Sequence, residues 1–147
     1  MNIRSANESD ISYIANSLSD YFERTNFLIG FPKYKNDSEL MLKVVSNRIS
    51  DKNSEYKYIV AEDDKGLHGF LNILTSEESP EILIIIGDSK EVKGRLLDEA
   101  INLMSSLVFP SVIGEMNKGD ELEDLIKEKP SEIIQLRYKM NLSTSGK

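Results

Sequence analysis

The residues best suited to chemistry lie in one stretch, EILIIIGDSKEVKGRLLDEAINLM, residues 81–104. A run of apolar residues stops at GD, a short polar segment follows, and Gly94 opens an amphipathic pattern. A strand, a glycine and a helix in that order can bind phosphate, because the first N–H groups of a helix have no partner within it. Lys90, Lys93 and Arg95 add positive charge there. The stretch therefore predicts either a phosphate site or only a strand that turns into a helix.

A few other side chains could act as a base or a nucleophile. Glu81 heads the apolar run, Glu115 lies in SVIGEM, and His68 is the only imidazole of the chain. For each of the three, the alternative interpretation is an ordinary position that faces solvent. Ser105 and Ser106 have no histidine and carboxylate pattern near them that would activate a nucleophile. Glu81 is the preferred candidate base, because burial at the head of an apolar strand would raise the pKa of its carboxyl group.

Composition narrows the classes of function. The chain has 147 residues and a formal charge of −7, which predict one domain, residues 1–147, whose surface repels nucleic acid. It has no cysteine and one histidine, so we expect neither disulfides nor a metal site. No apolar run approaches the roughly 20 residues that span a bilayer, and no secretory signal is visible at the N-terminus. We therefore expect a cytoplasmic protein without membrane contact.

Periodicity predicts the elements that would position these residues. A short strand is followed by a helix that Asn7 caps with the help of Asp10. A β-hairpin is predicted before the apolar run. The aromatic loop 26–35 could either pack on the core or form a cleft wall, and residues 143–147 are predicted to form a flexible tail. The expected strands are 2–6, 56–62, 68–75, 81–86, 111–116 and 132–142, and the expected helices are 7–23, 38–49, one from Gly94 onward, and 119–129.

The order of these elements resembles the GCN5-related N-acetyltransferase (GNAT) superfamily. IRSANESDISYI resembles its first strand and helix, and YIVAEDDKGLHGFLNI resembles its second and third strands. EILIIIGDSKEVKGRLLDEAINL stands where the family has its acetyl-CoA element, and LRYKMNL resembles its closing strand. The resemblance covers about residues 2–142. It implies an α/β (α+β) fold of order β-α-α-β-β-β-α-β-α-β, with a mixed, mostly antiparallel sheet and helices on both faces.

The resemblance also implies a cofactor site. In the family, the fourth strand splays from the fifth and its free backbone groups bind the pantetheine arm of acetyl-CoA, which assigns Ile84, Ile85 and Ile86 to that arm. The following loop, of pattern Gln/Arg-x-x-Gly-x-Gly/Ala, binds the pyrophosphate, which assigns Lys93, Gly94 and Arg95 to it. Counting from the end of the strand puts Glu91 at the Gln/Arg position and Leu96 at the second glycine. Only one of the three signature positions is kept.

The expected activity follows from the same resemblance. It implies an N-acetyltransferase that moves an acetyl group from acetyl-CoA to an amine of a small molecule or peptide, with Glu81 as the base. Asn117 stands where the family often has an asparagine, but the usual proton-donating tyrosine falls near Leu125 or Ile126. The alternative is a non-catalytic binding or assembly module of the same fold that has lost productive CoA binding. An unpaired strand edge at the C-terminus would also allow two copies of the chain to pair as a homodimer.

Overall fold

A five-stranded sheet forms the centre of the protein in the computed structural model, which describes residues 1–24, 38–117, 119–132, 134 and 140. The strand order is β1-β2-β3-β4-β5, so each strand lies beside its neighbours in sequence. The first four strands are antiparallel, and β5 runs parallel to β4. The strands are β1 (Asn2–Ser5), β2 (Tyr56–Asp63), β3 (Gly66–Leu74), β4 (Glu81–Gly87) and β5 (Ile113–Gly114).

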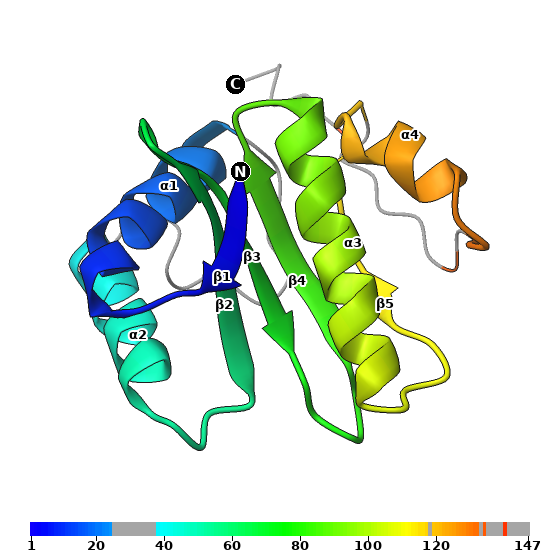
Figure 1. The fold of residues 1–147 in the computed structure, drawn as a ribbon, viewed down its shortest axis with the longest axis horizontal. Coiled ribbons are helices and arrows are strands. Elements are labelled where there is room, and N and C mark those ends of the chain that lie inside the picture. Colours follow the sequence, from blue (N-terminus) through cyan, green and yellow to red (C-terminus); the bar gives the residue numbers. More distant parts are fainter. Residues whose placement is uncertain (25–37, 118, 133, 135–139, 141–147) are drawn as a thin grey trace, which may run out of the picture.

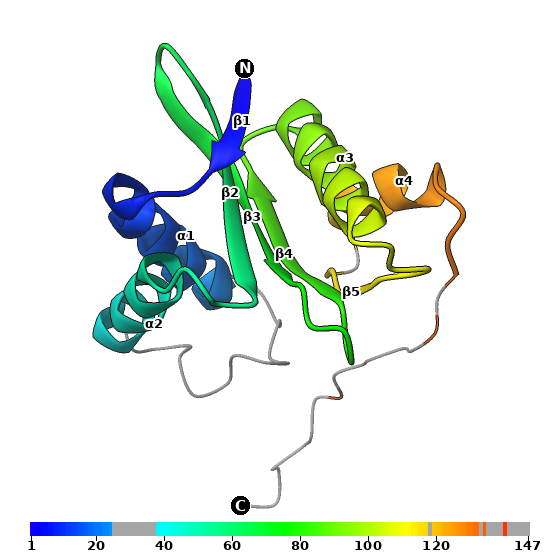
Figure 2. The same ribbon diagram turned by 60° about the horizontal axis from the view of Figure 1, so that its bottom comes forward.

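Helices cover both faces of this sheet (Figure 1). The helices α1 and α2 lie against one face and α3 lies against the other, with α4 packed beside α3, as the turned view in Figure 2 also shows. In sequence order the helices are the 3-10 turn η1 (Glu8–Asp10), α1 (Ile11–Arg24), α2 (Ser38–Ser50), α3 (Lys90–Ser106) and α4 (Leu122–Lys127).

Two apolar cores lie between the sheet and its helices, one on each face of the sheet. Strand residues alternate between them, because successive side chains of a strand point to opposite faces. Tyr58, Val60, Phe70 and Ile84 face α1 and α2. The core on the other face joins strand residues to α3 and α4, through Ile59, Ala61, Leu71, Ile73, Ile85, Val92, Leu96, Leu97, Ala100, Met104 and Leu122. This pattern explains why β4 is a nearly continuous apolar run, since both of its faces are covered.

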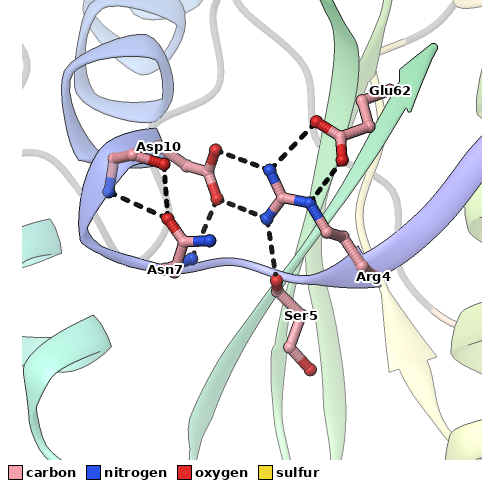
Figure 3. A network of polar contacts seen from close by, with 6 residues as sticks. Arg4, Ser5, Asn7, Asp10 and Glu62 are labelled. Carbon is pink, nitrogen blue, oxygen red and sulfur yellow. Dashed lines mark hydrogen bonds and ion pairs between the residues drawn. The ribbon is translucent and has the colours of Figure 1, made fainter.

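The N-terminus is fixed by an ion-pair network (Figure 3). Arg4 on β1 donates two hydrogen bonds to Asp10, of 2.7 and 3.0 Å, and two to Glu62 on β2, of 2.7 and 3.1 Å. Asp10 is buried and also accepts a bond from the Asn7 backbone N–H. Asn7 and Asp10 form a complete capping box. The predicted cap is therefore confirmed, and its acid is also the partner of Arg4.

The predicted fold class is confirmed, with three differences in the elements. The helix expected from Gly94 begins four residues earlier, at Lys90, because Ser89 caps it. The fifth strand is reduced from 111–116 to Ile113–Gly114, and the helix expected over 119–129 to Leu122–Lys127. The aromatic loop 26–35, the tail 143–147 and most of the strand expected over 132–142 lie outside the described residues. Within the described part of the chain, no helix has the length and apolar character needed to cross a membrane.

Candidate functional site

The edge of β4 that faces β5 is the main feature of the site. β5 pairs with β4 at only two positions, Glu81 with Ile113 and Ile82 with Gly114. Beyond Ile82, no described strand pairs with this edge, so the sheet opens from Leu83 to Gly87. A strand edge carries a row of backbone donors and acceptors that can bind an extended ligand. The residues assigned to the pantetheine arm, Ile84, Ile85 and Ile86, all lie in this open part.

A register shift marks the place where the sheet opens. On β3, Asn72 pairs with Ile84 and Ile73 pairs with Ile82, so Leu83 has no partner of its own on β3. Such an extra residue bends and twists its strand. Because the shift and the last β4–β5 pair fall at the same level of the sheet, the bend accounts for the departure of β4 from β5.

The first turn of α3 differs from the expected phosphate loop. Only Asp88 and Ser89 connect β4 to α3, and the Ser89 hydroxyl accepts a hydrogen bond from the Val92 N–H at 3.2 Å. Gly94 lies inside the helix rather than at its start. A Cβ atom built on Gly94 would lie 3.5 Å from Leu125 Cδ2. The glycine is therefore at the contact between α3 and α4, which the strand-to-loop count could not reveal.

The cations assigned to a pyrophosphate are distributed unevenly around that turn. The Lys93 ammonium lies 3.2 Å from Asp120 and 3.5 Å from Glu121, and the side chains of Lys93 and Asp120 are only 16% and 11% exposed. Lys90 pairs with Asp124 at 3.3 Å, whereas Arg95 is exposed. An anion at this helix start would compete with Asp120 for Lys93. The β4 edge thus fits a pantetheine arm, while the α3 start fits a pyrophosphate poorly.

Glu81, the candidate base, lies at the first residue of β4, opposite Leu74 on β3 and Ile113 on β5. Its side chain is half-buried, and no hydrogen bond or ion pair joins it to the described residues. Burial alone raises the pKa of its carboxyl group above the ordinary value. A carboxylate with a raised pKa is a better proton acceptor, so the local environment suits the predicted role.

The two weaker candidates have different surroundings. His68 lies between two carboxylates, with Nε2 2.7 Å from Asp63 and Nδ1 2.6 Å from Asp88. These hydrogen bonds raise the pKa of His68, and they occupy both ring nitrogens, so neither nitrogen is available to take a proton from an acceptor amine. It joins the β2–β3 turn to the start of α3. Glu115 follows β5, is half-buried and has interactions of its own.

One hydrogen bond that the sequence did not predict joins the segment after β5 to α1. The Asn117 amide, just after β5, donates a hydrogen bond of 3.0 Å to the phenol oxygen of Tyr21 on α1. Burial raises the pKa of Tyr21, so the phenol keeps its proton at neutral pH. Because 96 residues separate the two, no local pattern could have revealed this pair. In the sequence, Tyr21 is visible only as one apolar position of a helix.

Comparisons with known proteins bear on the fold. No family model matches the chain, and no curated protein matches it in sequence. A crystal structure of a probable acetyltransferase is 16% identical over 99% of this chain and 100% of that one, with a TM-score of 0.69.

Two further crystal structures are similar over nearly the whole chain. A transcriptional regulator from Bacillus halodurans C-125 is 13% identical over 96% of this chain and 99% of its own, with a TM-score of 0.67. A ribosomal-protein-alanine N-acetyltransferase from Brucella melitensis biovar Abortus 2308 is 13% identical over 96% of this chain and 98% of its own, with a TM-score of 0.63. Such identities establish shared architecture rather than shared activity. Together with the splayed β4 and β5, they show that this chain has the fold of the GCN5-related N-acetyltransferases.

Proposed function

We propose that this protein is an N-acetyltransferase that transfers an acetyl group from acetyl-CoA to an amine. The observation that carries the proposal is the open edge of β4 from Leu83 to Gly87. This edge can pair with the two amide groups of a pantetheine arm as an additional strand would. The whole-chain likeness to an N-acetyltransferase structure supports the same activity.

In this proposal, Glu81 and Tyr21 perform the proton transfers. Acetyl-CoA supplies the acetyl group as a thioester. Glu81 takes a proton from the acceptor ammonium, so that the nitrogen lone pair can form a C–N bond with the carbonyl carbon. The C–S bond then breaks, the sulfur takes a proton from the Tyr21 phenol or from water, and the nitrogen gives its second excess proton to the tyrosinate or hydroxide so formed. Tyr21 would thus serve in place of the tyrosine that is missing near Leu125 and Ile126.

A second candidate function is a non-catalytic binding module of the same fold. The observation that favours it is the negative charge near the expected pyrophosphate, from Asp88 in the short connection from β4 to α3 and from Glu91 in the first turn of α3. The pairing of Lys93 with Asp120 removes a further cation. The likeness to a transcriptional regulator shows that this fold also occurs in a protein whose description names no acetyl transfer.

Calorimetric titration with acetyl-CoA separates the two candidates. The enzyme proposal predicts a dissociation constant below about 100 µM, equivalent to more than about 5 kcal/mol of binding free energy. Heat that stays at the level of dilution up to millimolar acetyl-CoA would exclude the enzyme and leave the binding module.

The Glu81→Gln variant tests the base. Because the glutamine side chain keeps the shape of glutamate but accepts no proton, we expect turnover to fall about 10²–10⁴-fold while acetyl-CoA affinity stays within a factor of about two. Turnover is measured as thiol release with a panel of primary amines. Glu115→Gln is the matched control and should leave turnover near the wild-type rate. Equal turnover of the Glu81→Gln variant and the wild type would remove Glu81 from the mechanism.

A further inference from the structure

Asn72 is a polar side chain in the middle of an apolar core. It lies near the centre of β3, it has no exposed surface, and its neighbours across the sheet are Tyr58 and Ile84. Neither its amide nitrogen nor its carbonyl oxygen has a hydrogen-bond partner among the described residues. Burying an amide without partners costs free energy that an apolar residue of the same size would not cost. A group of this kind in a core calls for an explanation.

The position of Asn72 connects it with the open part of the sheet. Its neighbours Leu71 and Ile73 face α3, so the alternation of the strand turns Asn72 toward α1 and α2. Asn72 is also the last residue of β3 before the register shift. The unpartnered amide therefore lies at the level where β4 separates from β5.

Glu81 lies on the same face, one strand pair away. It pairs with Leu74, two residues after Asn72, and Ile82 beside it packs on the α3 side. The register shift puts one extra residue of β4, Leu83, between Glu81 and Ile84, the partner of Asn72, so the two side chains share a face on either side of the bulge. Leu74 and Glu81 are both partly exposed, so solvent reaches this face from their end. A carboxylate and a carboxamide, both without partners among the described residues, thus share one face of two adjacent strands.

The chemistry of the two side chains defines a ligand. A carboxylate attracts an ammonium group, whereas a carboxamide offers two N–H donors and one oxygen acceptor. An amide or peptide group presents the complementary acceptor and donor. We propose that Asn72 is a specificity-determining residue that hydrogen-bonds an amide adjacent to the amine of the acceptor, so that the preferred ligand is an α-amino amide, as at the N-terminus of a peptide.

This assignment deepens the proposed acetyl transfer, on which it rests, by choosing among its amine acceptors. It does not depend on acetyl-CoA for its test, because amine binding can be measured on the protein alone. The failure of one proposal is therefore distinguishable from the failure of the other. If acetyl-CoA does not bind but the preference for amides is found, the proposed transfer reaction is wrong and the assignment of Asn72 stands.

The test compares two small amines by NMR titration of the labelled protein. Glycinamide carries the amide next to the amine, and propylamine is the matched amine without it. We expect glycinamide to shift the side-chain amide signals of Asn72 and to bind at least about tenfold more weakly to the Asn72→Leu variant. Propylamine should bind the variant and the wild type equally. The assignment would be overturned if the variant lost affinity for both amines equally, or if the Asn72 signals of the wild type did not respond to glycinamide.

Thermal unfolding of the same variant provides an independent result. Leucine has nearly the shape of asparagine and needs no hydrogen bond, so Asn72→Leu should raise the melting temperature in the absence of ligand. A gain in stability together with a loss of amide preference is the combination that a ligand-binding residue predicts. A fall in melting temperature would mean that the amide stabilises the free protein, and the inference would then be wrong.

Discussion

Single residues of this protein show how charge is placed around the sheet. Arg4 holds the buried Asp10, and its hydrogen bonds keep the pKa of that carboxyl group below the ordinary value. His68 is held between Asp63 and Asp88, which connects the β2–β3 turn with the segment that caps α3. In both places one basic side chain joins two carboxylates from different segments of the chain. Each network therefore makes stability dependent on pH.

The His68 network predicts an effect at neutral to alkaline pH. Its folded pKa is raised above the unfolded value of about 6.5, so its contribution to stability is complete below that pH and is lost as the pH rises through the folded pKa. The pKa of Asp63 is lowered, so its contribution is lost only as the pH falls through its own folded pKa, below about 4. We expect His68→Gln to remove the decline of stability above a pH of about 6.5. Urea unfolding from about pH 5 to 9 measures the unfolding free energy of the variant and of the wild type. The same pH dependence in both proteins would refute the role of His68.

At the scale of elements, the sequence predicts what depends on local periodicity. The hairpin, the apolar β4 strand and the helix that Asn7 caps follow from alternation, helical spacing and capping chemistry within a few residues. The predicted start of α3 is wrong, because Ser89 caps the helix within the segment assigned to a phosphate loop. The sequence could not predict the Tyr21–Asn117 hydrogen bond or the ion pair of Lys93 with Asp120, because both join segments that only the tertiary fold brings together.

Two glycines near the start of α3 should respond oppositely to alanine. A Cβ atom on Gly69 of β3 would overlap the Ile86 carbonyl oxygen and lie 2.9 Å from Val92 Cγ1, so Gly69→Ala should cost about 1–3 kcal/mol of unfolding free energy. Gly94 is inside α3 with ordinary contacts, so Gly94→Ala should add about 0.5–1 kcal/mol. Chemical denaturation measures both free energies.

The Gly94→Ala variant also tests the assignment of Gly94 to a cofactor loop. If Gly94 is only an interior residue of α3, the Gly94→Ala variant should bind acetyl-CoA as tightly as the wild-type protein does. Weaker binding of acetyl-CoA by a stabilised variant would show that the backbone at Gly94 approaches the cofactor closely, as the resemblance implies. A destabilised Gly94→Ala variant would show instead that the packing of Leu125 on α3 leaves no room for a methyl group.

The whole molecule has the fold of the acetyltransferases, but the start of its α3 helix departs from the phosphate loop that the resemblance implies. The sheet opens between β4 and β5 beyond Ile82, Glu81 lies in the last β4–β5 pairs, and burial raises the pKa of both Glu81 and Tyr21. The start of α3 instead carries its own serine cap and a lysine held by aspartate. The proposed enzyme would therefore draw most of its affinity for acetyl-CoA from the pantetheine arm rather than from the pyrophosphate.

The most direct test observes the β4 edge itself. Backbone amide signals of the labelled protein are followed by NMR during titration with acetyl-CoA and, separately, with acetyl-pantetheine, which lacks the nucleotide. We predict that both ligands shift the amides of residues 83–87 and slow their hydrogen exchange, with affinities within about tenfold of each other, or about 1.4 kcal/mol. Signals of residues 83–87 that stay unchanged at millimolar concentrations of both ligands would contradict a pantetheine site at this edge.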